Sequence, residues 1–199
     1  MVEIPVIRSD FVCMASADHE EIQQLVEQAV EGDRAAYSKI VRMMMKPVVA
    51  LAYRMTGDRE AARDLAQDTF VSAWQNLSRF RGEAKFESWL YRIASNKTLN
   101  YLHSQKRFQS PDESSVPDRV SEIDSPDRIL EKEELQRNVL AFMESLPEQQ
   151  RLVFNLRFYR GMQFDEIAEV LGKAVGTVKT NYREAVRKLK ELAVEKGWQ

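Results

Sequence analysis

Apolar residues recur with helical spacing along most of this chain of 199 residues. Two such stretches predict helices that start at Asp18 and Asp33, because aspartate is a preferred N-cap and Gly32 separates the stretches. A Thr-Gly-Asp sequence at 56–58 predicts the end of the second helix and the start of a third, which runs to about Leu77. No stretch alternates apolar and polar residues as a half-buried strand does, so the pattern predicts an all-α protein.

A fourth helix is predicted within FRGEAKFESWLYRIASNKTLNYLHSQKR at 80–107, after a basic, glycine-containing loop at 79–85. The helical period of about 100° per residue places one set of residues on a buried face. This set is Phe86, Leu90, Ile93, Ala94 and Tyr101. Four helices joined by short loops predict a four-helix bundle domain at 18–108.

A second stripe follows the same helix and mixes an aromatic ring, amides and cationic groups. It consists of Trp89, Arg92, Asn96, Leu99, His103 and Arg107. This mixture is unsuited to a core but suits single-stranded nucleic acid, because bases stack on rings while amides contact base edges and cations bind phosphates. The pattern alone leaves one alternative open, a solvated helix face with Trp89 at the edge of the core.

Residues 109–127 contain three prolines, several serines and acids, and few large apolar groups, which predicts a flexible linker. Helical spacing returns at 128 and continues through a second four-helix domain, 128–199. Within it a short amphipathic helix, a turn at Gly172 and a longer basic helix predict a helix-turn-helix.

The formal net charge of −2 is unevenly distributed along the chain. Two segments are basic, 79–107 and 173–190, and two are acidic, 18–33 and 112–134. Two basic segments in an acidic chain predict two phosphate-binding surfaces. The second is the exposed face of the last helix of the predicted helix-turn-helix, formed by Thr177, Lys179, Thr180, Asn181, Arg183, Glu184 and Arg187. Such a helix enters the major groove, so Thr177 and Lys179 are placed for phosphates and Thr180, Arg183 and Glu184 for base edges. The alternative is an ordinary helical hairpin with a solvated basic face.

The third helix carries a mixed acidic and apolar surface of Asp64, Leu65, Gln67, Asp68 and Phe70, with Trp74 close by, and such a surface suits docking to a protein. The alternative is a solvated face above core aromatic residues. A metal site at Asp64 and Asp68 is disfavoured because no histidine or further acid accompanies them, so we expect no metal there.

Catalytic chemistry finds no support, because His19, His103 and Cys13 form no nucleophile–base set. One cysteine, no secretory leader and no apolar run of about 20 residues predict a cytoplasmic protein without membrane insertion. Residues 1–17 show no clear period, so we expect a disordered N-terminal arm, and Met14 is an alternative translation start.

The sequences AARDLAQDTFVSAW, FRGEAKFESWLYRIASNKTLNYLHSQKR and SLPEQQRLVFNLRFYRGMQFDEIAEVLGKAVGTVKTNYREAVRKLKE, in that order, resemble the extracytoplasmic-function (ECF) sigma factors of the sigma-70 family. The resemblance implies sigma region 2 at 18–108 and sigma region 4 at 128–199. It implies a non-enzymatic initiation factor that needs no cofactor and whose partners are core RNA polymerase, promoter DNA and an anti-sigma factor.

The resemblance also implies roles for the three surfaces. The set at 64–70 matches the helix that binds core polymerase, and the helix at 177–187 matches the reader of the duplex −35 element. The residues that match the single-stranded −10 contact are Arg79, Phe80, Arg81, Lys85, Trp89, Arg92, Asn96, His103 and Arg107. The family often has basic residues where this chain has Glu184 and Val186, so its −35 preference is expected to differ.

Three other hypotheses remain open from the sequence. A stand-alone helix-turn-helix regulator accounts for the C-terminal half but assigns no role to the Trp89 stripe. A metal-dependent nuclease uses Asp64 and Asp68, and a helical adaptor has no DNA role.

Overall fold

The structure, a computed structural model, describes residues 16–82, 84–108, 138 and 140–195. Its N-terminal half contains α1 (Ser16–Val30), α2 (Arg34–Thr56), α3 (Arg59–Asn76), the 3₁₀-helix η2 (Leu77–Arg79) and α4 (Phe86–Phe108). Its C-terminal half contains helical residues at 140–145, then α6 (Glu148–Phe154), the π-helical segment η3 (Asn155–Tyr159), α7 (Phe164–Leu171) and α8 (Val175–Glu195). The described residues include no strand, and the predicted all-α fold is confirmed. The predicted linker at 109–127 and residues 1–15 of the predicted arm lie outside the described residues.

Short-range capping signals determine where the N-terminal helices begin and end. The Asp33 carboxylate accepts hydrogen bonds from the backbone N–H groups of Ala35 at 2.7 Å and Ala36 at 3.2 Å. Gly57 ends α2 with a φ of 72°, a left-handed conformation that glycine adopts without steric cost. The predicted cap at Asp18 is wrong, because α1 already begins at Ser16. Ser16 and Ala17 do not oppose helix formation, so the first turn extends past Asp18.

The N-terminal bundle packs around α2, which contacts α1, α3 and α4. Of the predicted buried face of α4, Phe86, Leu90 and Ala94 are buried, whereas Ile93 and Tyr101 are only half-buried. Tyr91 is buried instead, with 4 % of its surface exposed. Its hydroxyl lies 3.5 Å from Arg160 Nη1, because the C-terminal half covers this side of α4.

The helix-turn-helix forms as predicted. Gly172 ends α7 with a φ of 60°, and α8 follows after a short turn. At the start of α7 the Gln163 N–H donates to Glu166 Oε2 at 2.7 Å, as part of a capping box. Buried Ile167, Val178 and Ala185 hold the two helices against the rest of the C-terminal half.

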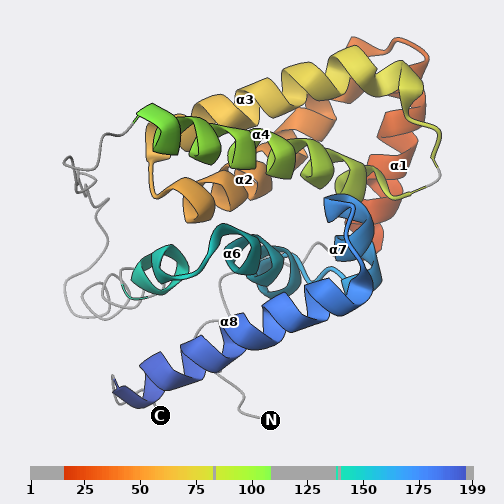
Figure 1. Cartoon of the computed structure of the whole chain (residues 1–199). Coiled ribbons are helices and arrows are strands. Elements are labelled where there is room, and N and C mark those ends of the chain that lie inside the picture. The colour runs from red at the N-terminus through yellow and green to blue at the C-terminus, as the bar shows by residue number, and fades with distance from the viewer. Residues whose placement is uncertain (1–15, 83, 109–137, 139, 196–199) are drawn as a thin grey trace, which may run out of the picture.

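The two halves pack directly against each other. One set of buried apolar side chains includes Met55 and Leu90 of the N-terminal half together with Leu152 and Leu156 of the C-terminal half. Figure 1 shows α6 lying between the N-terminal bundle and α8, so that α8 forms the outer edge of the molecule. The two candidate DNA-binding helices therefore differ in position: α4 lies at the interface between the halves, whereas α8 lies at the outer edge.

Buried polar groups cross the same interface. The Arg54 guanidinium donates to Asn155 Oδ1 at 3.3 Å and lies 3.8 Å from the centre of the Tyr159 ring. Asn155 Nδ2 in turn donates to the Leu51 carbonyl at 3.3 Å, and Arg151 Nη1 donates to the Met55 carbonyl at 2.6 Å. Burial lowers the pKa of Arg54 to about 10, so the group is still charged at neutral pH. Because each donor must meet its acceptor, these bonds select one register between the halves.

Candidate nucleic-acid interface

A cluster of three aromatic rings lies at the start of α4, formed by Phe80, which follows η2, and by Phe86 and Trp89 of the helix. Phe80 lies 5.6 Å from Phe86 and 5.3 Å from Trp89, measured between ring centres, and Phe86 is fully buried beneath them. Trp89 is half-buried, so its position in the core is fixed while part of its ring faces solvent. Such a ring is preorganised for stacking, because little conformational freedom is lost when a base contacts it.

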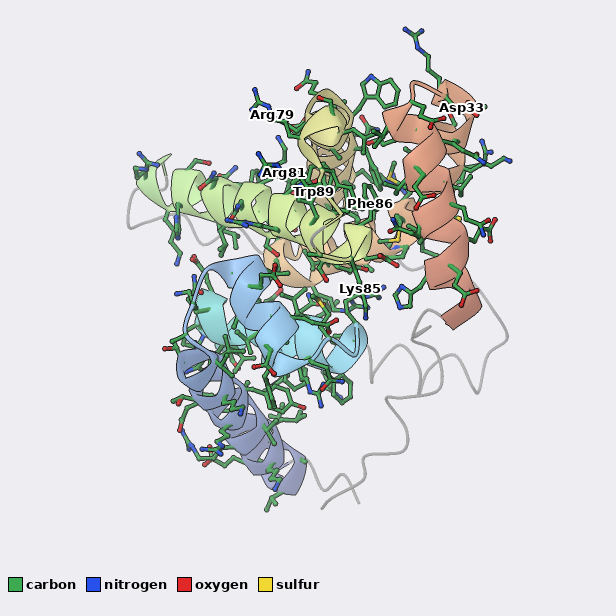
Figure 2. All side chains as sticks on the ribbon, turned by 90° about the vertical axis from the view of Figure 1, so that its right-hand side faces the viewer. Asp33, Arg79, Arg81, Lys85, Phe86 and Trp89 are labelled. Carbon is green, nitrogen blue, oxygen red and sulfur yellow. The ribbon has the colours of Figure 1, made fainter. Side chains whose placement is uncertain are left out.

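Cationic and amide groups surround this cluster. Figure 2 shows Arg79, Arg81 and Trp89 on the side of α4 away from the C-terminal half. Arg92 and Asn96 are exposed one and two turns further along α4, and Arg107 is exposed at its end. The predicted stripe is therefore accessible to a ligand rather than sealed in the bundle. We use the name α4 surface for Arg79, Phe80, Arg81, Lys85, Trp89, Arg92, Asn96, His103 and Arg107.

Lys85 and His103 of the α4 surface contact the C-terminal half. Lys85 Nζ lies 3.1 Å from Glu166 Oε1 of α7, and Figure 2 shows Lys85 at the boundary with that half. His103 Nε2 lies 3.0 Å from Glu148 Oε2 of α6, and Lys106 Nζ lies 2.6 Å from Oε1 of the same carboxylate. The sequence analysis missed Glu148 and Glu166, since no local pattern relates residues so far apart in the chain.

The two carboxylates are held in their charged form. Burial raises the pKa of Glu148, but its contact with Lys106 and the charge of His103 outweigh that effect and leave the pKa below its ordinary value. For Glu166 burial likewise raises the pKa, whereas the backbone N–H of Gln163 and the charge of Lys85 lower it by more. Both groups are therefore anionic at neutral pH, where they neutralise part of the α4 surface.

The exposed face of α8, the α8 surface, makes no comparable contact with the N-terminal bundle among the described residues. Thr177, Lys179, Thr180 and Arg183 are exposed, while Asn181 and Glu184 are half-buried. Arg187 is exposed but paired within its own helix, with Nη2 3.0 Å from Glu184 Oε2 and Nη1 2.6 Å from Glu191 Oε1. The positive charge on this face is therefore concentrated near Lys179 and Arg183.

On α3, the side chains of Asp64, Gln67 and Asp68 are exposed, Leu65 is half-buried and Phe70 is buried with 4 % exposed. Two apolar side chains are exposed on the same helix, Val71 at 55 % and Trp74 at 36 %; the sequence pattern placed Trp74 near this surface but gave no role to Val71. They line a groove of about 550 Å³ together with Phe70 and with Arg34, Tyr37, Ser38 and Gln75. Large exposed apolar residues beside acids are typical of a protein-docking surface. We call Asp64, Gln67, Asp68, Val71 and Trp74 the α3 surface.

Among the described residues, no cluster of three or more histidine, cysteine or acidic side chains is placed to hold a metal ion. Within the same part of the chain, no helix has the length and apolarity required to cross a bilayer.

Two family models match regions that contain α4 and most of α8. The family model for sigma-70 region 2 matches residues 40–108, and that for sigma-70 region 4 matches residues 136–189. The RNA polymerase sigma-H factor of Pseudomonas aeruginosa is 33 % identical over 180 residues, which cover 85 % of this chain and 93 % of that protein. The chain belongs to the sigma-70 family.

Further relatives place this sigma factor in the ECF group. The ECF RNA polymerase sigma-E factor of Escherichia coli K12 is 34 % identical over 175 residues, covering 82 % of this chain and 91 % of that protein. The structure of CnrH in complex with the cytosolic domain of CnrY is similar with a TM-score of 0.66 and 29 % identity, covering 88 % of this chain and 98 % of CnrH. The sigma factor RpoE of Bartonella quintana, solved with the anti-sigma factor NepR, has the same fold, with a TM-score of 0.65, 23 % identity, and coverage of 78 % of this chain and 95 % of that one. This chain is an RNA polymerase sigma factor of the ECF group, which directs transcription initiation.

Proposed function

We propose that this sigma factor divides promoter recognition between its two halves. The α4 surface binds unpaired bases of the −10 element, and the α8 surface binds the −35 element as a duplex. The observation that carries this division is the position of Trp89, which is fixed by Phe80 and Phe86 yet remains partly open to solvent beside exposed Arg92 and Asn96. A half-exposed ring flanked by an amide and a cation supplies stacking, base-edge and phosphate contacts together.

A base that leaves the duplex loses its stacking partners, which makes melting costly. A protein that binds the extruded base offsets part of this cost. Trp89 replaces part of that stacking, and Arg79, Arg92 and Arg107 compensate the phosphate charge around the opened strand. Arg79 and Arg81 lie on the same side of α4 as Trp89 (Figure 2), so they can contact a nucleotide whose base is held on the ring. The polymerase then performs the chemistry, so the factor itself requires no cofactor.

The α8 surface is suited to duplex readout. Thr177 and Lys179 lie near the N-terminus of α8, the end that enters the major groove in a helix-turn-helix. Arg183 is exposed one turn further along and offers a bidentate donor for guanine, whereas Glu184 is engaged by Arg187 at 3.0 Å. Base discrimination is therefore assigned mainly to Arg183 and Thr180.

The α3 surface is assigned to core polymerase. Its exposed acids and the two exposed apolar side chains offer a charged rim beside an apolar contact. We expect Asp64→Arg combined with Asp68→Arg to weaken the complex with core polymerase in a pull-down. The exposed Glu21 of α1 provides the control, since Glu21→Arg changes charge without altering α3.

We assign sigma region 2 to 18–108, the tether to 109–127 and sigma region 4 to 128–199. Two readers on one tether bind a promoter together, so avidity raises the affinity above that of either reader alone. We also propose a cytoplasmic location beside the polymerase and regulation by an anti-sigma factor. The second proposal is supported by the similar protein CnrH, whose structure was solved with the cytosolic domain of a second protein, CnrY.

In vitro transcription with core polymerase tests the division between the halves. Trp89→Ala is expected to reduce permanganate-reactive open complex by about tenfold, the effect of losing one base–aromatic stack, while duplex −35 binding persists. Trp89→Phe, which keeps a ring, should restore much of the opening. Arg183→Ala should show the opposite pattern, with weak binding to duplex and normal activity on a pre-melted template. Equal loss of both steps in either variant would contradict the assignment.

A further inference from the structure

Arg187, on the exposed face of α8, is held by two carboxylates of its own helix. Its Nε and Nη2 donate to Oε2 of Glu184 at 3.3 Å and 3.0 Å, and its Nη1 donates to Oε1 of Glu191 at 2.6 Å. The guanidinium is planar and its N–H groups have a fixed geometry, so it orients a carboxylate that it binds through two of them. Its donors are directed at acids of the protein rather than at DNA phosphate.

Glu184 uses only one of its two carboxylate oxygens in this pairing. Both contacts from Arg187 converge on Oε2, and Oε1 accepts no hydrogen bond from the residues that the structure describes. The Glu184 side chain is 43 % exposed, which leaves space for a ligand at the carboxylate. Because Arg187 compensates its charge, this carboxylate meets less repulsion from DNA phosphates than an isolated acid would.

The helical register places Glu184 beside the base-reading residues. Thr177, Thr180 and Glu184 follow one another at intervals of three and four residues, so they share one face of α8. The buried side of the helix is formed by other residues, among them Val178 and Ala185. A helix that presents its N-terminal turns to the major groove therefore brings Glu184 to the same groove, one turn behind Thr180.

A carboxylate distinguishes bases by the groups from which it can accept a hydrogen bond. In the major groove cytosine presents its N4 amino group, a donor, whereas guanine presents the acceptors N7 and O6 and thymine presents the acceptor O4. A carboxylate binds the first and is repelled by the other two. Adenine has a donor at N6 but also the acceptor N7, so it is the weaker alternative to cytosine.

We propose that Glu184 selects cytosine at one position of the −35 element through its free oxygen, and that Arg187 is the positioning residue that fixes the orientation of this carboxylate. The inference rests on the proposed −35 role of the α8 surface and adds a third reader to Arg183 and Thr180. Guanine and thymine are rejected at this position because their acceptors face an acceptor. Part of the promoter selectivity therefore arises from repulsion of incorrect bases.

Promoter binding by the full-length protein with core polymerase, measured on templates that vary each −35 position, tests the reader. We expect the wild type to prefer cytosine over guanine or thymine about tenfold at one position. Glu184→Gln should lose most of this preference, because an amide donates as well as accepts, while the preference set by Arg183 persists. Glu195→Gln makes the same chemical change at the exposed end of α8 and should leave every preference unchanged.

A base analogue identifies the group that Glu184 contacts. A pyrimidinone base lacks the exocyclic amino group of cytosine, and its substitution for the preferred cytosine should weaken wild-type binding about tenfold. The same substitution should have little effect on Glu184→Ala, which has no acceptor in the side chain. Comparison of the four affinities separates the contact from the weaker pairing of the analogue with guanine.

Arg187→Lys tests the positioning role. Lysine keeps the positive charge but lacks the rigid fork that binds one carboxylate oxygen through two N–H groups. We expect the preference for cytosine to fall about two- to threefold, with the salt dependence of binding unchanged because the charge is the same. Lys190→Arg is the control for exchanging a cation on the same part of α8 and should leave the preference unchanged.

The outcomes separate this inference from the function on which it rests. If no cytosine preference depends on Glu184, or if the analogue weakens the wild type and Glu184→Ala equally, the reading role is overturned, and the −35 role of α8 stands on Arg183 and Thr180. A cytosine preference that Arg187→Lys leaves intact would overturn the positioning role. If wild-type binding is indifferent to every −35 position, the −35 role itself fails, and the inference fails with it.

Discussion

The α4 and α8 surfaces are both basic but differ in where their acidic partners lie. Lys85 and His103 of the α4 surface pair with carboxylates on the other half of the chain, at 3.1 Å and 3.0 Å. Arg187, the paired cation of the α8 surface, instead pairs with Glu184 and Glu191 on its own helix. Pairing within a helix persists whatever the arrangement of the halves, whereas pairing between halves is lost when they separate. Availability of the α4 surface therefore depends on conformation, and that of the α8 surface does not.

The largest effect is expected from the buried contact that holds the halves in register. Arg54→Met removes the donor to Asn155 and the cation over Tyr159, which should destabilise the packed form by about 2 kcal/mol. The matched control is Arg59→Met, because exposed Arg59 lies 5.9 Å from the Tyr53 ring and should contribute far less. Denaturant unfolding measures the stability, and carbodiimide crosslinking of the ion pairs between the halves measures the packing. Similar losses from both variants would show that Arg54 has no special role between the halves.

A comparable but more specific effect is expected on the α8 surface. Arg183→Ala should reduce discrimination at one position of the −35 element by about 1–3 kcal/mol, the value of a bidentate base contact. Lys179→Ala should weaken all sequences evenly and reduce the salt slope by about one unit. The two variants are compared by measuring their binding to a library of −35 duplexes at several salt concentrations. Neither substitution should change crosslinking between the halves, and identical selectivity profiles would contradict the assigned roles.

Releasing Arg187 should strengthen duplex binding slightly. Glu191→Gln removes one of its two partners without changing the base-reading residues, so DNA affinity should rise by about two- to fivefold. Lys190 offers a control for charge on the same turn, as Lys190→Gln should lower affinity modestly. Fluorescence anisotropy with a −35 duplex is the measurement. Single-stranded −10 binding should not respond to Glu191→Gln, and a response would link the two surfaces.

Acid should open the packed form, with the smallest effect in this series. Because the pKa values of Glu148 and Glu166 lie below the ordinary 4.5 in the packed form, their ion pairs contribute fully above 4.5. The contribution decreases as the pH falls below that value and through the lowered pKa values, where the carboxylates become protonated. Small-angle scattering from pH 7 to about pH 3.5 follows the opening. The double variant Glu148→Gln, Glu166→Gln should not show this pH-dependent opening. If its scattering changes with pH as the wild type's does, other groups cause the opening.

Much of the fold was predictable because its signals are local. Asp33 caps α2, Gly57 ends it, and Gly172 forms the turn before α8, each through contacts within a few residues. The half-exposed state of Trp89 was not predictable. A tryptophan at the edge of an apolar stripe fits both a core and a binding surface, and only its packing on Phe80 and Phe86 distinguishes them.

The sequence by itself determined the helices, their boundaries to within a few residues, and the two basic faces, because hydrogen bonds and side-chain periodicity within a helix depend on near neighbours. Only the tertiary structure decided that Tyr91 is buried, and that Glu166 and Glu148 meet Lys85 and His103. These contacts join residues 81 and 45 positions apart, and their geometry depends on how the two halves pack. The spacing of apolar residues along the chain does not predict that packing. The packing depends on shape and charge complementarity between surfaces that exist only once the helices have folded.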